Sequence, residues 1–116
     1  MNKLLNYSAL QRHFDNASFV VNTQQQIAKD FAKFNLYFPE HFAKDALDML
    51  TITTYIGERI AELMKEGETR LLQLLYTIDL PEKDFLAITT HPNFIAEISR
   101  LILVREAYKV YLRSTY

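Results

Sequence analysis

Glycine and proline are scarce in this chain, and that scarcity limits the folds that it can adopt. Only 2 glycines and 3 prolines occur among the 116 residues. A β-sandwich or barrel of this length needs many tight turns, which these two residue types usually supply. A helical bundle needs fewer turns, because its elements are longer. The sequence therefore favours an all-α fold.

Apolar residues recur at helical spacing along most of the chain. A stripe from Ile27 to Phe38 and a longer one from Phe42 to Leu63 both advance mostly in steps of three or four residues. We predict a bundle of four main helices, with a short N-terminal helix and a short helix before the C-terminal helix. The expected ranges are about 9–15, 24–36, 40–66, 69–78, 80–88 and 93–113.

Local signals suggest where these helices begin and end. Thr23 and Gln26 form a capping-box pattern, so the second helix is expected to begin there and residues 16–22 to be a connector. Pro39 is expected to end that element and to open the third helix. Gly67 is expected to end the third helix, because glycine readily adopts the left-handed conformation of a helix terminus.

Small residues recur every four positions within the expected third helix. Thr53, Gly57 and Ala61 lie at this spacing, which places them on one face. A ladder of small residues lets a neighbouring helix approach closely. We therefore expect another helix to pack against this stretch. Asp79 and Glu82 have the same capping-box spacing as Thr23 and Gln26, so we expect a capping box at the start of the short fifth helix.

Composition indicates a globular protein and excludes the kinds of site that require cysteine. Hydrophobic residues make up 49% of the chain and charged residues 23%, too apolar a mixture for a disordered segment. The chain begins with methionine and carries no purification tag, so we expect a complete natural chain with one domain over residues 1–116. The absence of cysteine excludes disulfides and zinc–thiolate sites, and a cytoplasmic location is expected.

Known catalytic and cofactor motifs are missing from the sequence. None of the three histidines, His13, His41 and His91, follows a glutamate in a Glu-x-x-His motif. The two glycines match neither a phosphate-binding loop nor a dinucleotide-binding fingerprint. No apolar run approaches the roughly 20 residues that span a bilayer. We therefore expect no cofactor, no metal site, no membrane partner and no enzymatic activity.

The expected last helix has apolar residues on two sides. Its first face is formed by Phe94, Ile98, Leu101, Tyr108 and Leu112, with a polar seam of Ser99, Glu106, Lys109 and Arg113 beside it. The second face provides interface candidates: Leu103, Val104, Ala107, Val110 and Tyr111. Either this helix is the centre of the bundle, or its second face binds a partner.

Arg105 lies in the middle of the first face and is a candidate buried charge. A buried guanidinium needs a carboxylate partner, and none lies three or four residues away on the same helix. Asp45 is the first candidate, with Asp79 and Asp84 as others. The alternative is that the aliphatic part of Arg105 covers the core while its charged end remains in water.

The segment from Phe31 to Phe42 is rich in aromatic residues. Phe34, Tyr37 and Phe38 are interface candidates, because aromatic residues are enriched at binding surfaces. The alternative is that they pack the corner between two helices.

The leading functional hypothesis is a small non-enzymatic protein-interaction module that forms a homodimer through its C-terminal helix. One alternative is a DNA-binding, transcription-associated protein, although the net charge of −1 makes nucleic acid a poor partner. The other is a helical bundle that binds an apolar small ligand.

Overall fold

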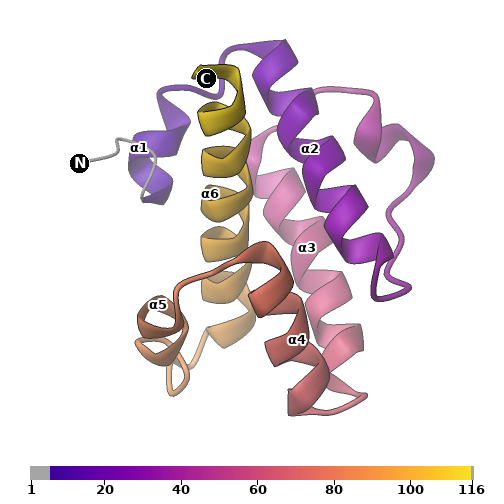
Figure 1. The fold of residues 1–116 in the computed structure, drawn as a ribbon, viewed down its shortest axis with the longest axis vertical. Coiled ribbons are helices and arrows are strands. Elements are labelled where there is room, and N and C mark those ends of the chain that lie inside the picture. The colour runs from indigo at the N-terminus through magenta and orange to yellow at the C-terminus, as the bar shows by residue number, and fades with distance from the viewer. Residues whose placement is uncertain (1–5, 116) are drawn as a thin grey trace.

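The computed structural model describes residues 6–115 and confirms the all-α fold (Figure 1). No strand occurs within this range. The elements are α1 (Tyr7–Gln11), α2 (Ala17–Ala32), the 3-10 helix η1 (Glu40–Ala43), α3 (Met49–Met64), α4 (Glu68–Ile78), α5 (Glu82–Leu86) and α6 (Phe94–Thr115). As expected, α2, α3, α4 and α6 are the main helices, α1 is short, and short α5 precedes the last helix.

Helix α6 runs through the middle of the bundle and contacts α1, α2, α3 and α4. Figure 1 shows α2 and α3 on one side of α6, α1 on the other, and α4 near the end where α6 begins. A helix surrounded in this way must bury most of its circumference. Within the described chain, no helix combines the length and the apolarity needed to cross a bilayer.

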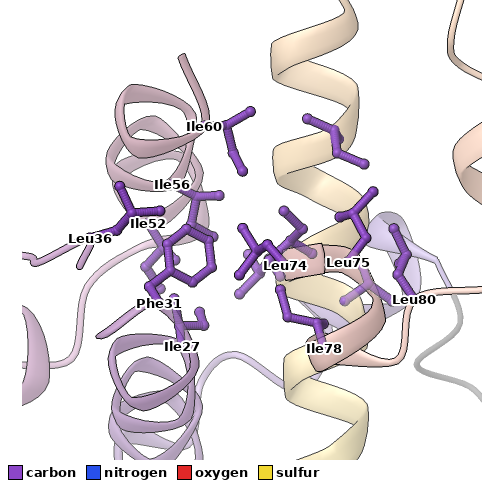
Figure 2. Close-up of a cluster of buried hydrophobic side chains, with 14 of the residues drawn as sticks. Ile27, Phe31, Leu36, Ile52, Ile56, Ile60, Leu74, Leu75, Ile78 and Leu80 are labelled. Carbon is purple, nitrogen blue, oxygen red and sulfur yellow. The ribbon is translucent and has the colours of Figure 1, made fainter. Parts of the chain in front are cut away.

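The core lies where α2, α3 and α4 meet against α6. Figure 2 shows side chains of α2 and α3, among them Phe31 and Ile56, on the side facing Leu74 of α4. All three are completely buried. Burial of one such side chain contributes about 1.5–3 kcal/mol relative to leaving it in water. The apolar stripes of the sequence are therefore the surfaces that hold the helices together.

Helix α2 begins seven residues earlier than the sequence suggested. The side chain of Asn16 accepts a hydrogen bond from the backbone N of Phe19 at 3.1 Å, which caps the helix. Thr23 is not a cap; it is fully buried, and its hydroxyl donates to the carbonyl of Phe19 at 2.9 Å. Residues 16–22 are therefore not a connector, because asparagine provides the earlier cap.

The expected third helix over residues 40–66 is divided into two elements. Residues 40–43 form η1, and α3 begins only at Met49. The side chain of Asp48 caps α3 by accepting a hydrogen bond from the backbone N of Thr51 at 2.7 Å. This cap and the loop before it interrupt the helix that the apolar spacing alone suggested.

Buried Gln24 of α2 holds the loop between η1 and α3 in place. Its side-chain amide N donates to the carbonyls of Phe42 and Asp45, the latter at 2.7 Å. Its carbonyl oxygen accepts from the backbone N of Leu47 at 2.8 Å. The amide thus supplies partners for three backbone groups that no helix satisfies.

Pro39 does not end α2, which already stops at Ala32, and it holds the N-cap position of η1 instead. Two further helix boundaries have different outcomes. α3 ends near the expected place, at Met64 with Lys65 as its C-cap, but Gly67 does not end it in the left-handed helical conformation: with φ 112° and ψ 160°, Gly67 is the N-cap residue of α4. Asp79 is not part of a capping box; it ends α4 in the left-handed conformation with a φ of 66°, and Pro81 holds the N-cap position of α5. The aspartate side chain is therefore available to another helix.

The small-residue ladder of α3 does bring a second helix close. A Cβ atom placed on Gly57 would lie 3.3 Å from both Ile95 Cγ2 and Ser99 Oγ of α6. That separation is tighter than ordinary van der Waals contact. The close approach of α3 and α6 therefore depends on the missing side chain at position 57.

We predict that Gln24→Leu lowers the free energy of unfolding by about 3 kcal/mol, because three buried backbone groups lose their partners. Urea denaturation measures this change. Gln25→Leu is the matched control: Gln25 is exposed and makes one hydrogen bond, to the carbonyl of Ala43 at 3.0 Å, so we expect a loss below about 1 kcal/mol. Equal losses would contradict the assigned role of Gln24.

Candidate functional site

The second apolar face of α6 is buried within one chain. Leu103 and Ala107 are completely buried, and Val104 and Val110 are 6% and 4% exposed. The assignment of these four residues to an interface is wrong, because α2, α3 and α4 pack around α6. Tyr111, 39% exposed, is the member of this face that reaches the surface.

The aromatic segment contributes mainly to packing at a corner of the bundle. Phe34 is buried beneath the guanidinium of Arg70, whose Cζ lies 4.9 Å from the ring centroid. Half-buried Phe38 stacks on Phe42 with ring centroids 4.1 Å apart. Tyr37 is 65% exposed and stays an interface candidate. The contacts of the other two favour the interpretation as a packed corner.

Arg105 pairs with Asp79, and not with Asp45. The Nη2 of Arg105 donates to Asp79 Oδ2 at 2.8 Å. Asp45 was the wrong choice, because it lies exposed in the loop before α3, which Gln24 holds. The left-handed end of α4 provides the carboxylate in its place. The Arg105 side chain is only 20% exposed, so it is a largely buried charge with a partner.

A second group of buried charges joins α2 to α6. Asp30 of α2 and Glu106 of α6 have side chains that are 3% and 0% exposed. The Nζ of Lys109 lies 2.9 Å from Asp30 Oδ2 and 2.6 Å from Glu106 Oε1. The Nε2 of Gln26 donates to Asp30 Oδ2 at 3.1 Å, and the Nζ of Lys33 lies 3.3 Å from Asp30 Oδ1. We call Asp30, Glu106 and Lys109 the α2–α6 charge cluster.

The two carboxyl groups of this cluster have opposite pKa shifts. Burial raises the pKa of Glu106 to about 9, and the hydrogen bond and negative charge of Asp30 add to the effect. Burial also acts to raise the pKa of Asp30, but hydrogen bonds with Glu106, Lys109 and Gln26 outweigh it and lower that pKa. At neutral pH, Glu106 is therefore a neutral acid that donates its proton to the Asp30 carboxylate.

The sequence did not predict this cluster, because helical periodicity does not show which neighbouring helix covers the polar seam of α6. Ser99 and Glu106 of that seam are buried against neighbouring helices. A usable signal was present: apolar residues lie on two sides of α6, so the polar residues between them were candidates for burial. Neither carboxyl lines the surface grooves described below, which indicates a structural role for the cluster.

The described residues contain no group of three or more His, Asp or Glu side chains placed to hold a metal ion. The remaining features of interest are grooves on the surface. One of about 420 Å³ lies beside the start of α2, and its lining includes His13, Asn22 and Tyr111. Another, of about 450 Å³, lies between the ends of α3, α4 and α6, beside α5, and its apolar lining includes Phe85 and Phe94.

A groove of about 390 Å³ follows the close approach of α3 and α6, and we call it the α3–α6 groove. Its lining is Leu50, Thr53, Thr54, Gly57, Glu58, Ala61, Ile95, Ala96, Ser99 and Arg100. Small side chains form its middle. Leu50, 72% exposed, belongs to the α3 wall, and Ile95, 36% exposed, belongs to the α6 wall. Each wall also carries one charge, Glu58 on α3 and Arg100 on α6.

Comparisons with protein-family models, with curated proteins and with solved structures find no match to this chain. The geometry of its surface and interior is therefore the basis for assigning a function.

We predict that Glu106→Gln removes a pH dependence of stability. In the unfolded chain Glu106 ionises near the ordinary glutamate pKa of 4.5, whereas in the folded chain it keeps its proton up to a pKa of about 9. Unfolding between these values releases a proton, so the free energy of unfolding falls as pH rises, by at most about 1.4 kcal/mol per pH unit. Glutamine stays neutral and can still donate to Asp30, so this fall disappears.

Urea denaturation at a series of pH values measures the difference between the wild type and Glu106→Gln. Glu62→Gln, at an exposed position of α3, is the control and should follow the wild-type curve. The contribution of Asp30 has the opposite sign: its lowered pKa stabilises the fold above about pH 3.8, and that stability is lost at lower pH. Parallel curves for Glu106→Gln and the wild type would show that Glu106 is ionised in the fold.

Proposed function

We propose that the protein is a small non-enzymatic interaction module that self-associates through the α3–α6 groove. One observation carries the proposal: large apolar side chains, Leu50 and Ile95, stand exposed on the two walls of a groove whose middle consists of small residues. Exposed apolar side chains lose contact with water when a partner covers them. A middle formed by Gly57, Ala61 and Ala96 leaves room for a side chain of that partner.

The proposal keeps the expected homodimer but changes its surface. The C-terminal helix takes part through Ile95 and Ala96 near its beginning, instead of through Leu103 and Val110. The latter two are buried in the chain, so they cannot reach a partner without unfolding. The cytoplasmic location expected from the sequence stays a prediction.

The nucleic-acid alternative receives less support. Three of the four cations of α6 are paired with carboxylates within the chain: Arg100 bonds Glu97, Arg105 bonds Asp79, and Lys109 bonds Asp30. The fourth, Arg113, donates to the side-chain oxygen of Gln26. Binding to phosphates needs cations that can displace counterions from the nucleic acid. The apolar-ligand alternative rests on the apolar groove between the ends of α3, α4 and α6, whose volume is in the range of small-molecule sites.

We predict that the wild type is a dimer and that Ile95→Glu weakens the dimer at least about tenfold, because two copies of an unpaired charge are buried in the interface. Sedimentation equilibrium measures the dissociation constant. Tyr76→Glu is the matched control, since Tyr76 is 67% exposed on α4 and lies outside the groove. Circular dichroism confirms that both variants keep their helices.

A wild-type chain that stays monomeric at about 1 mM would contradict the proposal, because an association weaker than this contributes less than about 4 kcal/mol. A dimer that Tyr76→Glu disrupts and Ile95→Glu does not would place the interface elsewhere.

A further inference from the structure

We infer that the occupant of the α3–α6 groove is a second copy of this chain, related by a two-fold axis parallel to the groove. In this arrangement α3 of each copy lies on α6 of the other, and Glu58 of one chain pairs with Arg100 of the second copy. The inference rests on the proposed function and adds the partner's orientation and the charges that select it.

The charges of the groove are complementary under this symmetry. Glu58 lies on the α3 wall and Arg100 on the α6 wall. Their neighbours in sequence, Gly57 and Ser99, are in close contact. Glu58 and Arg100 therefore lie within about one helical turn of each other along the groove. A two-fold axis along the groove exchanges the two walls, so each charge meets its opposite, and it does so twice in the dimer.

The other two-fold arrangement is disfavoured by the same charges. An axis across the groove places α3 on α3 and α6 on α6. Where that axis crosses the groove at the level of these residues, Glu58 is directed toward Glu58 of the second copy, and Arg100 toward Arg100. Like charges facing each other across an interface oppose association. The charge distribution thus selects the arrangement in which the axis runs along the groove.

The shape of the groove agrees with this choice. Ile95 lies beside Gly57 within its own chain, so the two residues are at nearly the same level. When the walls are exchanged, Ile95 of one copy falls on the helical face of Gly57 and Ala61 in the other. These two residues carry little side-chain volume, so the groove beside them can take up the isoleucine. The same contact repeats on the other side of the axis.

Existing contacts leave both charges able to pair. Glu58 accepts a hydrogen bond from the adjacent Arg59 at 2.8 Å, and its side chain is still 62% exposed. Arg100 bonds Glu97 at 2.5 Å, its Cζ lies 5.7 Å from the ring centroid of Tyr7, and its side chain is 42% exposed. A guanidinium has five N–H donors, so Arg100 can keep Glu97 and also bind a second carboxylate. The pairing between copies therefore does not require these local contacts to break.

Mixing two charge-reversed chains tests the inference. In this arrangement, Glu58→Arg alone and Arg100→Glu alone each place like charges across the interface, so each raises the homodimer dissociation constant at least about tenfold. In a mixture, one chain contributes Arg at position 58 and the other Glu at position 100, so both pairs are again opposite. Sedimentation velocity with one chain labelled should show a heterodimer with a dissociation constant within about threefold of the wild type.

The matched control reverses charges outside the groove. Glu40 and Lys44 of η1 bond each other at 2.6 Å, and Glu40→Lys and Lys44→Glu should each leave the dissociation constant unchanged. A wild-type dimer with no recovery in the mixture overturns the inferred arrangement and leaves self-association standing. A wild type that is monomeric at about 1 mM contradicts both the inferred arrangement and the proposed self-association. Recovery in the mixture cannot arise from a contact within one chain, because no chain carries both reversals.

Discussion

The enclosure of α6 by α1, α2, α3 and α4 is the constraint on which the rest of this structure depends. A helix surrounded on most sides must present apolar or paired side chains in every direction. Small residues meet that demand on the α3 side, where Gly57 admits Ile95 and Ser99. Charge pairing meets it on the α2 side, where Lys109 lies against Asp30 and Glu106.

The α2–α6 charge cluster shows how one chain buries several ionisable groups without leaving net repulsion. The two buried carboxyl groups share one largely buried cation, Lys109, because the second cation on Asp30, Lys33, is 54% exposed; an ionised Glu106 would therefore add negative charge in a region of low dielectric. Protonation of Glu106 removes that charge and supplies the hydrogen that Asp30 accepts. The cluster ties two helices together at a cost, because Glu106 must remain neutral at a pH where it would ionise in water.

The same enclosure decides which surfaces remain for a partner. Most of the last helix is buried by packing within the chain, so it contributes Leu103, Val104, Ala107 and Val110 to the core. Apart from its C-terminal end, where Tyr111 is exposed, α6 reaches the surface along the line beside α3, bordered by Leu50 and Ile95. Close packing of two helices thus creates both the stability of the bundle and the groove that we propose as its interface.

The sequence by itself determined the helical class, the number of main helices, the approximate end of α3 before Gly67 and the close approach at Gly57, because these follow from spacing and side-chain size. Only the tertiary structure decided which face of α6 is buried, that Asp79 and not Asp45 meets Arg105, and that Asp30 meets Glu106. Residues far apart in the chain make those contacts, and helical periodicity carries no information about which neighbour covers which face. An amphipathic helix reveals its buried side, whereas a helix that is apolar all round does not.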